Sequence, residues 1–275
     1  VFEEIGGLDE QAFSLGLNDL DLCLRVGQAG YLVVWTPHAS VVLSAQSPQL
    51  LEPAARELHA QEQETFYLRW LPKVARDPAY NPQLSLTSSN FRLESGIHGG
   101  WKPLYTRSVP SILALPINSS ATGHYRVTEP FKALEAAGLV VGRFVYEPPS
   151  VFDIERMSPD VILLQCRYGE GSPSELRRIK TYSSARRIFE LDDYVISAPK
   201  KNNHARNKAA NIEEIVRNSI GLCDRVVVTT DGLADALSSM HQDIRVVPNT
   251  LVPQLWNGLR GQRGISDRPR VGWGG

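Results

Sequence analysis

The sequence predicts an α/β protein in which a doubly wound parallel sheet follows a separate N-terminal region. The 275 residues are 42% hydrophobic, which provides enough apolar side chain for a sizeable core. From residue 109 onward, short apolar segments alternate with segments of helical periodicity, as in parallel sheets with helices on both faces. Prolines and glycines interrupt residues 71–108, which predicts a boundary there.

The N-terminal region is expected to hold two helices and two short strands. The segment 18–25 is predicted to be helical. Apolar and β-branched residues favour strands at 31–35 and 40–43, with a turn-prone Thr-Pro pair between them. A longer helix is predicted from about Pro53 to Trp70.

The second region alternates strands and helices. Strands are predicted at 111–116, 139–146, 160–166, 187–191, 225–228, 244–247 and 269–272. Helices are predicted after Thr128, over 172–182 and 205–221, and after Thr230. Thr128 and Thr230 are candidate N-caps, and Ser172 with Glu175 fits a capping box. Because ligands collect at the carboxyl ends of parallel strands, the loops at that edge are the natural place for a site.

Charge, cysteine content and hydropathy exclude several classes of protein. The chain has 29 Lys and Arg against 30 Asp and Glu, so it lacks the basic excess that binds nucleic acid. Three widely spaced cysteines suggest neither a disulfide framework nor a metal site, and favour a reducing, cytoplasmic location. No apolar run is long enough to span a membrane. The chain has no initiator Met and opens like the middle of a domain, so we expect a fragment.

Asp19 is the first candidate catalytic residue. Asp19 and Asp21 are two residues apart, so on one helix they diverge by about 200° and only one can face a given site. Leu20, Leu24 and Val26 are expected in the core, which leaves Asp19 near the helix start. There its carboxylate could cap the helix or, facing a cleft, act as a general base.

The loop 119–126 is the second candidate, because it joins a strand to a helix. Small residues before a helix N-terminus leave backbone N–H groups free for an anion or sugar hydroxyls, although they are also common for packing alone. The predicted substrate-binding residues are Gly123, His124, Tyr125 and Arg126.

Asp192 and Asp193 form the third candidate, at the end of a predicted strand. They could bind sugar hydroxyls or cap a helix, and the spacing of other ligands does not favour a metal. A basic cluster follows, which is either a solvated helix face or an attractor for acidic glycans. Its members are Lys200, Lys201, His204, Arg206 and Lys208.

Phe2–Glu10, Asn18–Arg25 and Gly30-Tyr31 together resemble the C-terminal half of a family-two glycosyltransferase of the GT-A fold. Residues 77–82 resemble the tail of such domains in bacterial surface-polysaccharide enzymes. The resemblance implies that Asp19 is the base that deprotonates the acceptor hydroxyl. The family's nucleotide pocket and Asp-x-Asp metal site would lie upstream, so Mn²⁺ or Mg²⁺ would serve only the complete module. No cofactor and no metal ligand are expected in this chain.

A second resemblance covers the rest of the chain, in five segments that follow one another in order. They are Thr122–Arg126, Leu191–Tyr194, Val228–Leu233, Val247–Asn249 and Val271–Gly274. This order is similar to the N-terminal, Rossmann-like, acceptor-side domain of a family-four glycosyltransferase of the GT-B fold. The resemblance implies that Asn249 helps to bind substrate where this domain closes. It also implies that Gly272, Trp273 and Gly274 begin the phosphate loop of a donor-binding domain.

The two resemblances divide the chain into the end of a GT-A-like module (1–95), a linker (96–108), a GT-B-like Rossmann domain (109–268) and the start of a further domain (269–275). The implied function is hexosyl transfer from a nucleotide sugar to a growing bacterial surface polysaccharide, with this fragment inactive by itself. Its implied partners are the sugar donor, the glycan acceptor and the flanking domains of the same chain. Peripheral contact with the inner membrane stays open.

Two other classes of function stay open. One is a non-catalytic, degenerate module that serves as an interaction or glycan-binding surface. It is favoured by the lack of a His at 43–47, where many family-two enzymes place a metal ligand, and by Asn18 in place of the usual Glu. The other is a small-ligand binder or oxidoreductase, against which the absence of a G-x-G-x-x-G loop argues.

Overall fold

The structure is a computed structural model. It describes residues 1–38, 40, 52–81, 83–86, 88, 90–93, 109–196, 211–250, 253, 257–258 and 268. The predicted linker at 96–108 and the predicted strand at 269–272 lie outside these residues, as do residues 41–43 and 205–210 of two further predicted elements.

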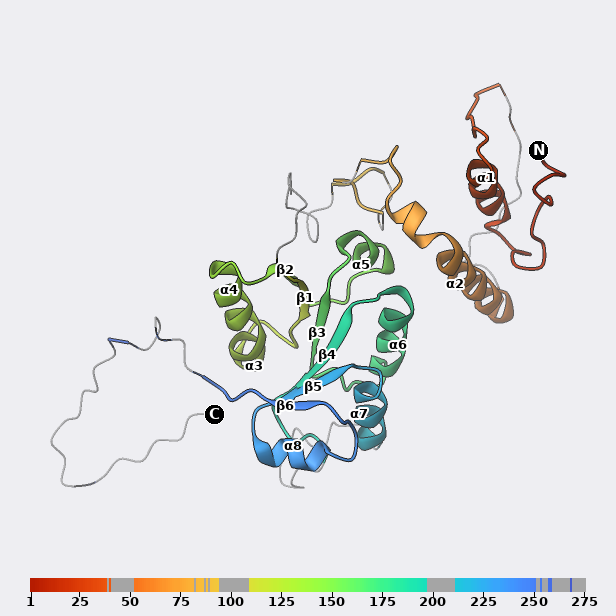
Figure 1. The fold of residues 1–275 in the computed structure, drawn as a ribbon. Helices are drawn as coiled ribbons and strands as arrows, with labels where there is room; N and C mark the ends of the chain where they lie inside the picture. The colour runs from red at the N-terminus through yellow and green to blue at the C-terminus, as the bar shows by residue number, and fades with distance from the viewer. Residues whose placement is uncertain are drawn as a thin grey trace.

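A parallel sheet organises the second region (Figure 1). Its strands are β1 (Ser111–Leu115), β2 (Val141–Phe144), β3 (Val161–Gln165), β4 (Arg186–Leu191), β5 (Arg225–Val228) and β6 (Ile244–Val246). All neighbouring strands pair in parallel, in the order β2-β1-β3-β4-β5-β6. The prediction of an α/β fold with a parallel sheet is therefore confirmed. The strand order reverses at β1, which creates a switch point beside it.

Helices connect the strands and cover the sheet (Figure 1). They are α3 (Ala121–Gly123), the π-helical turn η2 (His124–Thr128), α4 (Glu129–Ala136), α5 (Val151–Met157), α6 (Ser172–Tyr182), α7 (Ile212–Ile220) and α8 (Asp231–Leu237). In Figure 1, α3 and α4 lie on one side of the sheet and α5, α6 and α7 on the other. This division follows from right-handed crossovers, because the chain moves from β1 to β2 in one direction and from β2 to β3 and onward in the other.

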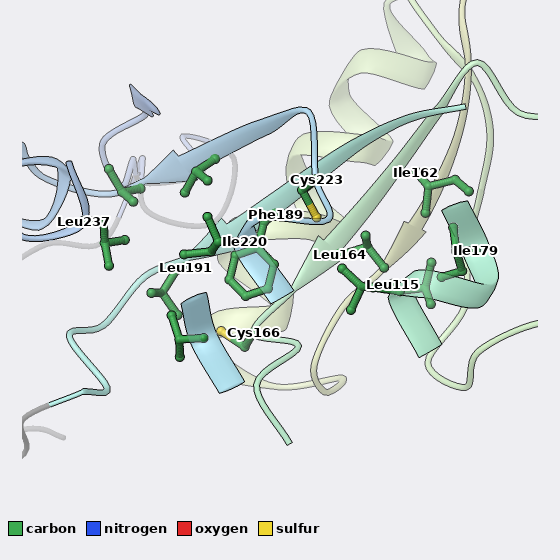
Figure 2. Packing of buried hydrophobic residues seen from close by; sticks show 14 of the residues in the cluster. Leu115, Ile162, Leu164, Cys166, Ile179, Phe189, Leu191, Ile220, Cys223 and Leu237 are labelled. Carbon is green, nitrogen blue, oxygen red and sulfur yellow. The ribbon is translucent and has the colours of Figure 1, made fainter. Parts of the chain in front are cut away.

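The main core lies between the sheet and α5–α8. Figure 2 shows Leu164, Phe189 and Leu191 from adjacent strands close to Ile220 of α7. All four side chains are fully buried. Burying each stabilises the fold by roughly 1.5–3 kcal/mol, and the alternation of these positions along β3 and β4 fixes the register of the sheet.

The N-terminal region contains α1 (Asn18–Gln28) and α2 (Pro53–Ala75). Phe13, which precedes α1, packs with Phe66 and Trp70 of α2, and Leu24 of α1 lies against this cluster. The strand predicted at 31–35 is wrong, because these residues have no regular structure. Leu32 and Trp35 are 88% and 84% exposed. Among the described residues, this β-branched segment neither pairs with another strand nor packs into a core.

Two predicted caps are also wrong. The helix after β1 starts at Ala121, so Thr128 is already helical and its hydroxyl donates to the carbonyl of His124. Ser172 is likewise the first residue of α6, and Gly171 takes the N-cap position without a side-chain bond. The prediction for Thr230 is confirmed, since its hydroxyl accepts the N–H of Leu233 at 3.2 Å.

The two regions contact each other along α2, α5 and α6. Arg156 of α5 donates from Nε to the Ala75 carbonyl at 2.8 Å and from Nη1 to the Leu84 carbonyl at 2.9 Å. The Tyr182 hydroxyl at the end of α6 donates to Glu64 of α2. The N-terminal region is thus hydrogen-bonded to the helices on one side of the sheet.

Candidate functional site

A cavity of about 250 Å³, which we call the edge cavity, opens at the carboxyl edge of the sheet. Its lining residues are Ala121, Thr122, Tyr125, Arg126, Asp192, Asn249 and Thr250. These residues follow β1, β4 and β6, and because the strands are parallel, the segments after them meet at one edge.

The predicted residues Tyr125, Arg126, Asp192 and Asn249 are brought together here. They come from three segments separated by more than fifty residues along the chain. The turn that carries Tyr125 and Arg126 is π-helical, a geometry that is frequent at functional sites. Tyr125 is 43% exposed, so part of its ring is free to contact a ligand.

Arg126 is held by the protein itself. Its side chain is only 6% exposed, and Nε donates to Glu190 Oε1 at 2.6 Å. Nη1 donates to the Val247 carbonyl at 2.7 Å and to Asn249 Oδ1 at 3.2 Å. The guanidinium therefore fixes the segment after β6 against the helix after β1, which sets the width of the edge cavity.

Glu190 and Gln165 hold Arg126 and the segment after β1 in place, and both side chains are almost fully buried. Gln165 donates from Nε2 to the Thr122 carbonyl and accepts the Ile117 N–H on Oε1. Burial raises the pKa of Glu190, and the hydrogen bond from Arg126 offsets only part of that effect. Neither side chain was predicted from the sequence. A polar residue near the carboxyl end of an otherwise apolar strand could have indicated them, because a buried polar group needs a hydrogen-bond partner.

Asp192 borders the cavity directly after β4. Its Oδ1 accepts the Cys166 thiol at 3.3 Å, and its carbonyl accepts the Thr229 hydroxyl at 3.0 Å. Burial raises the pKa of the Cys166 thiol, and the charges of Asp192 and Glu190 raise it further. Cys166 therefore stays protonated at neutral pH and orients Asp192 instead of acting as a nucleophile.

The other predicted substrate-binding residues do not line the edge cavity. A Cβ at Gly123 would lie 1.9 Å from the Asn118 carbonyl oxygen, so this glycine permits a close backbone approach. His124 lies 3.6 Å from a carboxylate oxygen of Glu129 and packs edge-on against Tyr125. Asp193 is exposed. The predicted phosphate loop, Gly272, Trp273 and Gly274, lies outside the described residues, as does the basic cluster at 200–208.

Asp19 and Asp21 have different environments. Asp19 is exposed in the first turn of α1, does not line the edge cavity and accepts the N–H of Leu20. Asp21 is fully buried, and its oxygens accept Arg25 Nε at 2.7 Å, Arg69 Nη1 at 2.9 Å and Trp70 Nε1 at 2.8 Å. Leu20 is 49% exposed, so its expected place in the core is wrong.

These two aspartates do not fit a metal site. Asp21 already has both oxygens hydrogen-bonded to cationic or indole N–H groups, which leaves it unsuited to coordinate a cation. Within the described parts of the chain, no three His, Cys, Asp or Glu side chains are grouped to hold a metal ion. No described helix combines the length and apolar character needed to cross a membrane.

Comparison with known proteins gives one partial relative. No family model and no solved structure matches the chain. A stretch of 97 residues is 37% identical to uncharacterized protein y4gI of Sinorhizobium fredii (strain NBRC 101917 / NGR234). The match covers 34% of this chain and 11% of that protein, so the chain spans only a small part of the relative's length. No family is assigned by these matches, and the geometry of the edge cavity carries the functional conclusion.

Proposed function

We propose that the chain is part of a bacterial glycosyltransferase that moves a hexosyl group from a nucleotide sugar to a surface glycan. In this proposal, the region from residue 109 is the Rossmann-like, acceptor-side half of a GT-B-type module. Residues 1–95 are the end of a GT-A-like module. The free, buried thiols of Cys166 and Cys223 fit a reducing, cytoplasmic location.

One observation carries the proposal: the segments after β1, β4 and β6 meet at the edge cavity, beside the point where the strand order reverses. In open parallel sheets, ligands bind at this place. The cavity combines a carboxylate (Asp192), an aromatic ring (Tyr125) and an amide (Asn249), which are suited to a sugar's hydroxyl groups and apolar C–H face.

The residues have distinct parts in the proposed acceptor site. The Asp192 carboxylate accepts a hydrogen bond from a sugar hydroxyl, and the Tyr125 side chain lies against the sugar ring. Arg126 is a positioning residue, because its hydrogen bonds hold Asn249 and the Val247 carbonyl. The donor and the cation or positively charged side chain that stabilises its leaving group belong to residues beyond 250, so the edge cavity binds and orients the acceptor only.

A thermal-shift and transfer experiment tests the proposal. UDP-glucose, GDP-mannose and dTDP-rhamnose are added to this chain and to the whole protein that carries it. We expect stabilisation and glycan labelling by one of these donors only with the whole protein. Stabilisation of the 275-residue chain alone would place a donor pocket within it and contradict the acceptor-side assignment.

The second candidate function is a non-catalytic, degenerate module that serves as an interaction or glycan-binding surface. The specific observation in its favour is that the Asp21 carboxylate is hydrogen-bonded to Arg25, Arg69 and Trp70. Asp19, in contrast, is exposed on the helix surface. Donor-dependent transfer that survives Asp19→Asn in the whole protein would favour this candidate for the N-terminal region. Loss of transfer with unchanged folding would favour the base role.

A further inference from the structure

A second cavity, of about 440 Å³, lies where the N-terminal region contacts the sheet domain, and we call it the junction cavity. Tyr67 of α2 and Leu86 line it from the N-terminal region, and Phe152 of α5 with Glu175, Arg178 and Ile179 of α6 line it from the domain. Both regions are needed to form it, and cavities at such junctions are common ligand sites.

The walls of the junction cavity are mainly apolar and aromatic. The rings of Tyr67 and Phe152 meet edge to face, with centroids 5.2 Å apart and planes at 81°. Tyr67 makes a similar contact with Tyr182, whose hydroxyl donates to Glu64. The aromatic wall is therefore fixed by packing before any ligand arrives.

Glu175 lines this cavity, and one oxygen of its carboxylate has no donor within the described parts of the chain. Its Oε1 is fully buried and has no hydrogen-bond partner among the described residues. The predicted capping role would have used this carboxylate, but Ser172 does not occupy the N-cap position. Buried polar atoms in folded proteins nearly always find partners, so an unpartnered carboxylate oxygen beside a cavity indicates a missing donor.

Arg178, one helical turn from Glu175, gives the cavity a positive charge. Its Nη2 lies 3.1 Å from Glu64 Oε1, and its guanidinium lies over the Tyr182 ring. A cationic ligand would be repelled by Arg178, and an anionic one by Glu175. A purely apolar ligand would leave the Glu175 oxygen unpaired. The cavity therefore suits a neutral ligand with hydroxyl donors and an apolar face.

We propose that the junction cavity binds a pyranose sugar, with one hydroxyl donating to the Glu175 carboxylate and the C–H face against Phe152 and Tyr67. This inference rests on the proposed glycan-handling function, and it adds a sugar subsite separate from the edge cavity. The two subsites share no lining residue. A glycan would then contact the N-terminal region and the sheet domain together.

Saturation-transfer NMR of this chain with methyl α-D-glucopyranoside, methyl α-D-mannopyranoside and methyl α-L-rhamnopyranoside tests the proposal. The variants all carry Asp192→Ala, which removes binding at the edge cavity; in this background we expect at least one sugar to bind and Glu175→Ala to weaken that binding at least tenfold. Arg178→Gln is a second variant at a half-exposed position, and we expect it to weaken binding about threefold or more. Glu135→Ala, at an exposed position on α4, is the matched control and should leave binding unchanged.

Asp192→Ala separates the two cavities. Binding that persists in Asp192→Ala and is lost when Glu175→Ala is added supports the junction subsite. Binding that is already lost in Asp192→Ala alone overturns this inference and leaves the proposed function intact. No binding of any of the three sugars to the wild type, or equal binding by Asp192→Ala with and without Glu175→Ala, also overturns the inference.

Discussion

At the residue scale, the clearest contrast is between the two aspartates of α1. Both are acidic and two residues apart, yet only Asp21 is buried and hydrogen-bonded to distant side chains. Burial by itself would raise the pKa of Asp21, but hydrogen bonds from Trp70, Arg25 and Arg69 outweigh it and lower the pKa. The sequence pattern could not separate the two, because it does not show which side of α1 faces α2.

Asp21→Asn should destabilise the chain by about 2–4 kcal/mol, because it leaves Arg25 and Arg69 without a buried counter-charge. The folded-state pKa lies below the unfolded value near 4, so this stabilisation is present above pH ~4 and is lost as the pH falls further. Urea unfolding at pH 7 measures the loss. Asp19→Asn is the control and should not shift the midpoint, and equal effects of both changes would refute the structural role of Asp21.

Glu175 is predicted to give the opposite pH dependence. Burial raises its pKa, while Arg167 and Glu147 act on it in opposite directions and Arg178 lies one turn away on α6. A raised folded-state pKa means that stability falls as the pH rises from the unfolded value toward the folded one. Glu175→Gln removes this decline. The Tm of the variant minus the Tm of the wild type should therefore increase from pH 4 to pH 8. A constant difference, as expected for the control Glu135→Gln, would contradict the prediction.

At the scale of elements, the six strands of the parallel sheet were predicted well and the helix ends poorly. The runs that became β3 and β5 are apolar and β-branched, so their pattern alone specifies buried parallel strands. Helix starts depend on local hydrogen bonds that several Ser and Thr residues could make. Ser150, which no motif singled out, forms a capping box with Asp153, whereas Ser172 does not cap α6.

The serines at 150 and 172 give a matched test of this difference. The Ser150 hydroxyl accepts the Asp153 N–H and donates to Asp153 Oδ2, so Ser150→Ala should cost about 1–2 kcal/mol. Ser172→Ala removes no cap and should cost less than half as much. Chemical denaturation of the two variants compares them, and an equal or reversed order would show that the cap is misplaced.

At the scale of the whole molecule, Arg156 joins the two regions. Its two hydrogen bonds to backbone carbonyls connect α5 to the end of α2 and to Leu84. The parallel alternation predicted the sheet domain, but no local pattern indicated that α2 would dock on α5 and α6. Such contacts between distant segments depend on matching surfaces, and single-sequence periodicity does not record them.

Arg156→Ala should weaken the contact of α5 with the end of α2 and Leu84 by a free energy of about 1–3 kcal/mol, because two carbonyl groups lose a charged donor. Hydrogen exchange should then speed up over the end of α2 and residues 76–86, while β3 and β4 stay protected. Arg177→Ala, at an exposed site on α6, is the control. Uniform acceleration across the sheet would contradict a role confined to the junction.

Acceptor binding through Asp192 at the carboxyl edge of the sheet is the proposal on which the assigned function depends. Saturation-transfer NMR with methyl glycosides tests it on three proteins. The first is Glu175→Ala, which removes binding at the junction cavity, and the other two combine this change with Asp192→Ala or with Asp193→Ala. We expect at least tenfold weaker binding when Asp192→Ala is added and no change with Asp193→Ala, whose side chain is exposed and outside the cavity. Equal binding by all three proteins, or no binding by any of them, would refute the acceptor site.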